Sequence, residues 1–151
     1  MKAPLWKRNV IGAVVSVAAF AVAAAFVLWP AWQRYQQTVR PAHVAAAGDT
    51  IEVDGLTWSI RNVSRSTMRR GAPLPEGTVV VNVLVERSGT PEQGFGCYGY
   101  LIDGDRSWRA DGPPCGAAVS IPWTFLVPTA TEPTAVDIRK PDGSVLIRFR
   151  L

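Results

Sequence analysis

The chain has 151 residues, and its 16 Lys and Arg against 12 Asp and Glu give a net charge of +4. Five of the bases lie within residues 1–40, which hold no acid, so residues 41–151 hold the other 11 bases and all 12 acids, a net of −1. The excess positive charge is therefore confined to the N-terminal part. A near-neutral remainder lacks the basic surface that nucleic-acid binding requires, so we expect no nucleic-acid partner.

Residues 10–29 read VIGAVVSVAAFAVAAAFVLW, hold no charge and contain Ser16 as their single polar side chain. Twenty helical residues span about 30 Å, the thickness of the hydrocarbon core of a bilayer. Lipid offers no partner to unpaired backbone groups, so a single stretch of this length crosses as a helix. We therefore predict a transmembrane helix over residues 10–29, preceded by a cytoplasmic stub over residues 1–9.

The flanks of this helix predict its orientation. Lys2, Lys7 and Arg8 precede the helix, whereas Arg34 and Arg40 are the bases that follow it closely. The more positive flank stays in the cytoplasm. We therefore expect a cell-membrane protein with its N-terminus inside and its C-terminal domain outside. Aromatic residues also stand where membrane interfaces would lie, namely Trp6, Trp29, Trp32 and Tyr35.

A cleaved signal peptide is the alternative to an uncleaved anchor. The apolar region of a signal peptide is about 7–15 residues long and ends at a small-x-small site. Here the apolar stretch is longer, and the small triplet at residues 23–25 is followed by further apolar residues. We therefore favour an anchor that stays attached. Gly12, Ala13 and Ser16 also form a small-residue face that permits close helix packing.

Residues 30–48 are predicted to continue the helix for a few turns and then to form a loose tether. This segment is first polar and then rich in alanine, with Pro30 and Pro41 as breaks. The single histidine of the chain, His43, lies within it. A catalytic triad or a Cys-His pair would therefore depend on a flexible segment, so we expect a solvated linker histidine and no catalytic residues.

Residues 49–151 alternate apolar and polar side chains between turn dipeptides, which is typical of antiparallel strands. The strongest stretch is 78–87, where every other residue from Val79 to Val85 is valine. Pro122 removes a backbone donor and so places its strand at an edge or at a bulge. About eight strands are expected, namely residues 51–53, 56–64, 78–87, 98–102, 106–109, 119–127, 134–139 and 144–151.

Short strands at this spacing, with no convincing helix after the anchor, predict an all-β fold, an antiparallel immunoglobulin-like β-sandwich. The cysteine and tryptophan spacing of antibody domains is absent. Cys97 and Cys115 are instead expected to tie a loop to its neighbour, because an even cysteine count outside the cell favours a disulfide. Such a bridge would stabilise the domain by about 3 kcal/mol. Two buried free thiols are the alternative.

Strand and turn sequences across most of residues 49–151 carry a family resemblance. They are GLTWSI (55–60), PEGTVVVNV (75–83), LIDGD (101–105), Trp108 and FLVP (125–128). Through them the domain resembles the telokin-like, immunoglobulin-fold extracytoplasmic family of Gram-positive bacteria. The resemblance implies a fold and a location outside the membrane, and it brings no catalytic residues. The long anchor would make this chain a membrane-tethered member.

Phe95, Tyr98 and Tyr100 are interleaved with glycines and form the first candidate binding region. Loops of this kind on a rigid domain are where binding residues collect. A disulfide at Cys97 would hold the loop in shape before a partner arrives. The alternative is that the two tyrosines alternate into the core as strand residues.

Arg69 and Arg70 form the second candidate binding region, in a loop over residues 66–77. If the strands that carry further arginines adjoin, they make a cationic face for anionic lipid headgroups or cell-wall polymers. An ordinary solvated strand face is the alternative. The arginines concerned are Arg61, Arg65, Arg69, Arg70, Arg148 and Arg150.

The DGD sequence at residues 103–105 suggests calcium, but it fails as an EF-hand loop because Trp108 stands where glycine is needed. A calcium site of another kind that includes Asp111 stays open, beside the simpler interpretation of a hairpin turn. The two cysteines form no CxxC motif, so we expect neither a metal site nor a cofactor.

These features predict a single-pass membrane protein that displays a disulfide-tied domain outside the cell. We expect no enzymatic activity and a role as a binding or assembly module that engages a protein partner or an envelope component. The alternative is a structural subunit of a membrane complex, recruited through its transmembrane helix. An unrelated helix in place of residues 10–29 would abolish the second role and leave the first intact.

Overall fold

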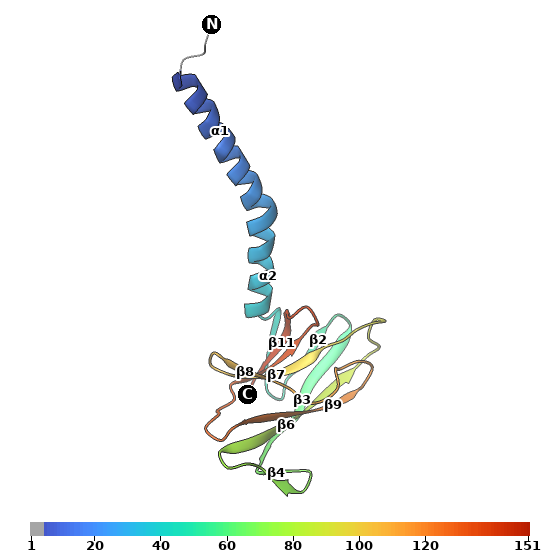
Figure 1. Ribbon diagram of the computed structural model, residues 1–151. Helices are drawn as coiled ribbons and strands as arrows, with labels where there is room; N and C mark the ends of the chain where they lie inside the picture. The colour runs from blue at the N-terminus through green and yellow to red at the C-terminus, as the bar shows by residue number, and fades with distance from the viewer. Residues whose placement is uncertain (1–4) are drawn as a thin grey trace. The chain divides into compact units, whose positions relative to one another are not determined.

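The computed structural model describes residues 5–151 (Figure 1). The chain forms two compact units, one over residues 1–37 and the other over residues 38–151. The first unit is helical over its described residues, and the second is built mainly from strands, as the sequence predicted. Of the expected stub over residues 1–9, residues 1–4 lie outside the described part.

Three helical segments follow one another without a break, α1 (Leu5–Ala23), the π-helical turn η1 (Ala24–Leu28) and α2 (Trp29–Val39). The π turn has a local cause. Pro30 has no N–H and its ring clashes with the carbonyl group four residues earlier, so the helix widens just before it. The Trp29 N–H accordingly donates to the carbonyl oxygen of Ala24, five residues back. The predicted helix therefore continues past residue 29 and ends at Val39.

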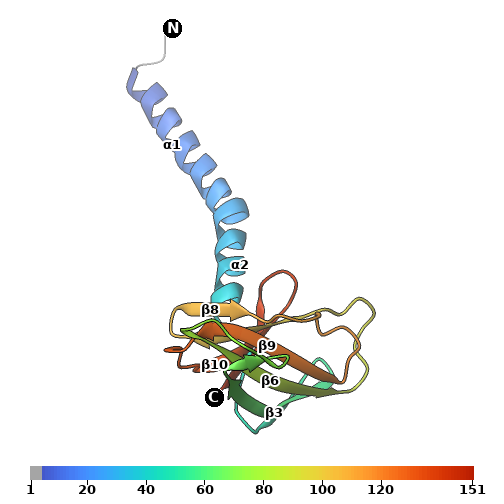
Figure 2. The ribbon, with the colours of Figure 1, turned by 60° about the horizontal axis from the view of Figure 1, so that its bottom comes forward.

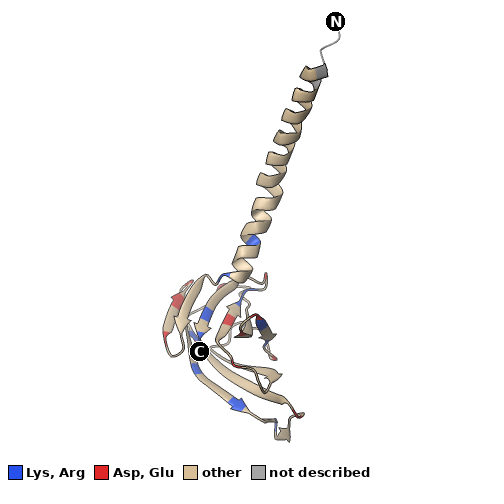
Figure 3. Cartoon of the chain, turned by 90° about the vertical axis from the view of Figure 1, so that its left-hand side faces the viewer, with Lys and Arg blue, Asp and Glu red and all other residues tan. Residues whose placement is uncertain are grey.

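The helix is long and apolar enough to span a membrane. Its candidate span, Asn9–Val39, has 31 residues, and the most apolar window of 18 has a mean hydropathy of 2.6. Residues 9–33 carry no charged side chain, and Figure 3 shows this part of the helix in tan. Large side chains such as Phe20 and Phe26 are more than two-thirds exposed. Lipid would cover apolar surface of this kind.

Residues 38–151, all of them described, contain eleven strands. They are β1 (His43–Ala46), β2 (Thr50–Val53), β3 (Leu56–Ser66), β4 (Met68–Arg69), β5 (Ala72–Pro73), β6 (Thr78–Ser88), β7 (Tyr98–Asp103), β8 (Arg106–Arg109), β9 (Ser120–Pro128), β10 (Ala135–Arg139) and β11 (Val145–Arg150). Two open sheets and one hairpin result. The sheet orders are β1-β11-β10-β7-β8 and β2-β3-β6-β9, while β4 pairs with β5 (Figures 1 and 2).

The eight strands expected from the sequence correspond to β2, β3 and β6 through β11, with ends that differ by one or two residues. The prediction of a mainly β fold after one apolar helix is confirmed. The tether prediction was wrong over His43–Ala46, because this segment forms β1. The strand is parallel to β11, whereas the other pairs are antiparallel. Its ends are held by bonds from the Ala42 N–H to Val145 and from the Ala47 N–H to Arg150.

Side chains from both sheets form one hydrophobic core. Trp58 and Trp123 of the four-stranded sheet and Leu101 and Phe149 of the five-stranded sheet are fully or almost fully buried. Gly99 of β7 lies directly against the ring of Trp123, where an added Cβ would stand 2.4 Å from ring atoms. Only glycine allows the backbone of one sheet to approach the other this closely.

Pro122 lies on β9, which is the edge of the four-stranded sheet, as the sequence predicted. The Val119 carbonyl accepts a bond from the Arg87 N–H of β6, at 2.7 Å. The Thr124 carbonyl points to the other side and accepts from the Asp111 N–H at 2.8 Å. Because backbone groups alternate along a strand, Pro122 faces the same free side as Thr124. Its missing N–H therefore costs no bond to β6, and no bulge interrupts that pairing.

Cys97 and Cys115 form the predicted disulfide, which joins positions 18 residues apart. Their Cα atoms are 5.1 Å apart, and both side chains are fully buried. The Cys115 N–H also donates to the Cys97 carbonyl, at 2.9 Å. The bridge ties the loop before β7 to the loop before β9 and so fixes one end of the domain.

Candidate functional site

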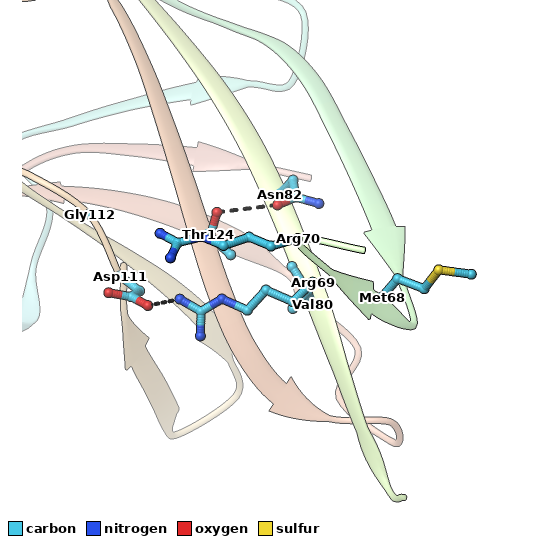
Figure 4. Close-up of a pocket in the computed structure, with 8 residues that line it drawn as sticks. All are labelled: Met68, Arg69, Arg70, Val80, Asn82, Asp111, Gly112 and Thr124. Atoms are coloured by element: carbon cyan, nitrogen blue, oxygen red, sulfur yellow. Dashed lines mark hydrogen bonds and ion pairs between the residues drawn. The ribbon is translucent and has the colours of Figure 1, made fainter. Parts of the chain in front are cut away.

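A groove lies between the β4–β5 hairpin and strands β6 and β9 (Figure 4). Its volume is about 310 Å³. Asn82 and Thr124 face away from the core here, because they alternate with buried residues on their strands. The lining combines polar, charged and apolar groups, namely Met68, Arg69, Arg70, Val80, Asn82, Asp111, Gly112 and Thr124.

The hairpin beside the groove has a two-residue turn with an arginine at its first position. The Leu74 N–H donates to the Thr67 carbonyl at 3.0 Å and closes the base. Arg70 and Gly71 form the tip, with φ of 52° and 81°. Two successive positive φ values are typical of the type I′ hairpin turn, in which Asn-Gly is the preferred pair. Arginine in this left-handed conformation costs about 1–2 kcal/mol.

The groove contains one paired and one unpaired arginine. Arg69 forms an ion pair with Asp111 across it. Arg70 makes no hydrogen bond or ion pair with any residue of the described part. Figure 4 shows both arginine side chains extending in the same direction, while the Thr124 hydroxyl donates to the Asn82 amide oxygen at 3.3 Å. A free guanidinium beside polar strand residues is suited to an anionic group.

The structure separates the aromatic residues of the first candidate region. Phe95 packs against the core, with its ring centre 6.1 Å from that of Trp58. Gly99 faces the core, so Tyr98 and Tyr100 on either side of it point to the outer face of the five-stranded sheet. Both tyrosines are half-buried. They neither enter the core nor join Phe95 in one exposed loop.

On that outer face each tyrosine is covered by an arginine. The guanidinium of Arg109 lies 4.1 Å from the ring centre of Tyr98, and that of Arg139 lies 4.4 Å from the ring centre of Tyr100. At these distances the cation is attracted to the face of the ring. The tyrosines therefore already have partners within the domain.

Asp137 is buried at the centre of the same face. Arg148 donates to it from Nε and Nη2, at 2.6 and 2.8 Å, and Arg139 donates from Nη2 at 3.1 Å. The bonds to Asp137 raise the pKa of the Arg148 guanidinium above its ordinary value. Both oxygens of the Asp137 carboxylate therefore have arginine partners within the domain.

The continuous cationic face proposed for the arginines does not form. Arg148 and Arg150 lie on β11 and therefore belong to the five-stranded sheet, whereas Arg61 and Arg65 lie on β3 in the other sheet. The strands do not adjoin. Arg61 also pairs with Glu86 at 2.6 Å, and Arg65 donates to a backbone carbonyl.

Arg87, near the end of β6, was not among the expected site residues. It is 2% exposed, and its guanidinium carbon lies beside the rings of Trp58 and Phe95, 5.4 and 5.5 Å from their centres. Its Nη1 donates to the Gly116 carbonyl at 2.8 Å. Burial lowers the pKa of Arg87. The alternation in residues 78–87 predicts its inward direction, because Arg87 continues the series of inward valines.

Two of the acidic residues that suggested calcium have cationic partners. Asp103 accepts a bond from Arg106 at 2.6 Å, and Asp111 pairs with Arg69. Within residues 5–151 no group of three or more His, Cys, Asp and Glu side chains is placed to hold a metal ion. His43 is exposed on β1, at an edge of the five-stranded sheet.

No family model, curated protein or solved structure matches the chain. The function is therefore inferred from the chemistry of Arg70 and Arg87, two of the arginines that have no carboxylate partner in the described part. One lies in an open groove, and the other lies in the core beneath an aromatic ring.

Proposed function

We propose that the chain is a membrane-anchored, extracytoplasmic binding module without enzymatic activity. Its groove engages an anionic group of a protein partner or an envelope component. The observation that carries the proposal is Arg70, which has no partner among the described residues and is held at a φ of 52°. A residue kept in an unfavourable backbone conformation is a candidate for function. Arginine is also the side chain best suited to bidentate binding of carboxylate and phosphate.

Each of the two units supports a location at the membrane with the strand-rich unit outside. The apolar helix supports an anchor, and the bases that precede it support an N-terminus in the cytoplasm. The second unit then lies outside. A disulfide supports that location, because such bonds persist in oxidising compartments and are rare in the cytosol.

We also propose that residues 49–151 form an immunoglobulin-like sandwich of the telokin-like type, to which β1 adds an edge strand. Two open sheets that share one core, and pairing that is almost entirely antiparallel, support it. Such a domain presents hairpins and loops on a rigid scaffold, which is where the groove lies.

Site-specific photocrosslinking in intact cells tests the groove. A benzophenone amino acid replaces Thr124 of the groove lining in the full chain, so that Arg70 is kept, and the matched control replaces Arg150, an exposed residue on a distant strand. We expect a discrete crosslinked product at position 124 that position 150 does not give, and that Arg70→Ala removes. The same pattern at both positions, or no product at position 124, would contradict the proposal.

Thiol labelling of intact cells tests the location. A membrane-impermeant maleimide is applied with and without prior reduction, and labelling of Cys97 and Cys115 is measured. We expect labelling only after reduction, because the two thiols are joined in a domain that lies outside the membrane. Labelling only after lysis, without reductant, would place the domain in the cytoplasm and overturn the assignment.

A structural subunit of a membrane complex is the second candidate, and one feature favours it. Gly12 has no atom within 4 Å of the position of an added Cβ, so the small-residue face with Ala13 and Ser16 is open to a neighbouring helix. An unrelated transmembrane helix in place of residues 10–29 distinguishes the roles. Loss of assembly would favour the subunit, and retained crosslinking at position 124 would favour the binding module.

A further inference from the structure

Arg87 is a buried charge that lacks a carboxylate partner within residues 5–151. Buried arginines are normally paired, because a charge away from water is costly. The Gly116 carbonyl accepts from Nη1, but Nε and Nη2 are buried without any hydrogen-bond partner. These two nitrogens lie on one edge of the planar guanidinium. Both donors on that edge therefore lack an acceptor among the described residues.

A second arginine of the same domain shows what this edge binds. Arg148 uses its own Nε and Nη2 to hold the two oxygens of Asp137, at 2.6 and 2.8 Å. The arrangement is the fork by which a guanidinium holds a planar carboxylate. The equivalent edge of Arg87 offers the same pair of donors with no protein group bound to them.

Trp58 adds a third donor of the same kind. Its indole Nε1–H is buried and has no partner in the described chain. The ring of Trp58 lies 5.4 Å from the Arg87 guanidinium carbon. This part of the core therefore holds three buried donors without an acceptor among the described residues, Nε and Nη2 of Arg87 and Nε1 of Trp58. Each unpaired buried donor lowers the free energy of unfolding.

Phe95 connects this region to a cavity. Its ring centre lies 5.5 Å from the Arg87 guanidinium carbon, and Phe95 also lines a cavity of about 570 Å³. Gly94 and Gly96 flank Phe95 in the sequence, and glycine gives the backbone the freedom that a movement of this ring would need. The cavity lining is Asp54, Leu56, Glu92, Gly94, Phe95, Gly96, Lys140 and Pro141.

We propose that the pocket behind Phe95 binds a small carboxylate compound. The two carboxylate oxygens accept from Nε and Nη2 of Arg87, and one of them also accepts from Nε1 of Trp58. The rest of the compound occupies the cavity, where Asp54 and Glu92 outnumber Lys140. Its far end is therefore neutral or positively charged. This site is distinct from the groove at Arg70 and does not depend on the role proposed for that groove.

The test follows the indole N–H resonances of the ¹⁵N-labelled full chain in detergent micelles during titration with acetate. Trp58→Phe assigns the resonance of Trp58. We expect this resonance to shift and saturate with acetate, and to stay unchanged with acetamide, the neutral analogue. In Phe95→Ala the shift should saturate at lower acetate concentration, because the covering ring is gone.

Arg87→Lys should weaken acetate binding by about tenfold or more, because one edge of a bidentate fork is lost. Arg150→Ala is the matched control and should leave binding unchanged, since Arg150 is an exposed arginine that does not line the cavity. A shift that persists at full affinity in Arg87→Lys would overturn the proposal, and so would no saturable shift in either the native chain or Phe95→Ala. Glu92→Gln must retain acetate binding. If this variant instead moves the Trp58 resonance without acetate, Glu92 is the occupant and the proposal is wrong.

Discussion

The outer face of the five-stranded sheet and the disulfide end of the core each bury a charge, and they stabilise it in different ways. On the outer face two arginines donate three hydrogen bonds to buried Asp137. At the disulfide end Arg87 lies beside two aromatic rings and donates to one carbonyl. The first arrangement gives both carboxylate oxygens arginine partners and leaves one buried arginine donor, Nε of Arg139, without an acceptor in the described residues. The second leaves two, Nε and Nη2 of Arg87, and has no carboxylate.

The difference separates a structural role from a binding role. A carboxylate with all its oxygens bonded contributes to stability and cannot be removed without leaving arginines unpaired. A buried arginine with free donors contributes less to stability than a paired one, because its desolvation is only partly offset. We therefore expect substitutions on the outer face to change the free energy of unfolding, and substitutions at Arg87 to change binding instead.

Removal of the disulfide should have the largest effect on stability. The double variant Cys97→Ala and Cys115→Ala loses the restraint on an 18-residue separation and should lower the free energy of unfolding by about 3 kcal/mol. Urea unfolding of the full chain in micelles, followed by tryptophan fluorescence, measures the change. Reduction of the native chain is the control and should give a similar loss. A loss below about 1 kcal/mol would contradict the expectation.

Asp137→Asn should come next, with a loss of about 2–3 kcal/mol. The substitution keeps the shape of the side chain but leaves Arg139 and Arg148 without their carboxylate. The loss is smaller than for a fully buried pair, because the two arginine side chains are 21% and 27% exposed and regain some hydration. The same urea unfolding assay measures the loss. An unchanged midpoint would mean that the hydrogen bonds to Asp137 contribute nothing to the free energy of unfolding.

Arg139→Ala should cost about 1 kcal/mol, since it removes one hydrogen bond to Asp137 and the cation over Tyr100 while the two-bond contact of Arg148 stays. Arg148→Ala is the matched comparison and should cost more. The two unfolding curves, measured side by side, decide the order. A larger effect for Arg139 would reverse the assignment of the main partner of Asp137.

Arg87→Met should change the free energy of unfolding by less than about 1 kcal/mol, because an apolar side chain of similar length removes the desolvation cost along with the contacts. The acetate response of Trp58 should nevertheless disappear. A loss of several kcal/mol would make Arg87 a structural residue like those around Asp137, and the contrast between the two regions would no longer hold.

The sequence was enough to predict the elements that form from a local pattern of side chains. The helix follows from an uncharged stretch long enough to cross lipid, and strands such as β6 follow from alternation with period two. The edge position of Pro122 and the Cys97–Cys115 bridge also follow from the chemistry of single residues. The strand β1 does not, because four residues of an alanine-rich segment have no strand pattern and are held by pairing with β11 at the far end of the chain.

The candidate sites, too, could be predicted from the sequence only in part. Sequence alone identified Arg69 and Arg70 as neighbours in a loop, but only the folded chain pairs Arg69 with Asp111 and leaves Arg70 free over β6 and β9. It also separates Phe95 from the two tyrosines, because a strand sends successive side chains to opposite faces.

Chain length, charge and periodicity act locally, so the sequence was enough to predict the division of the chain into one apolar helix and a strand-rich domain. Which arginine has a carboxylate partner depends on how the sheets assemble. Asp137 meets Arg148 through the pairing of β10 with β11, and Arg87 meets two aromatic rings at the end of the core. Pairing of charges depends on distances between segments that are remote in the chain, and those distances arise only when the sheets assemble.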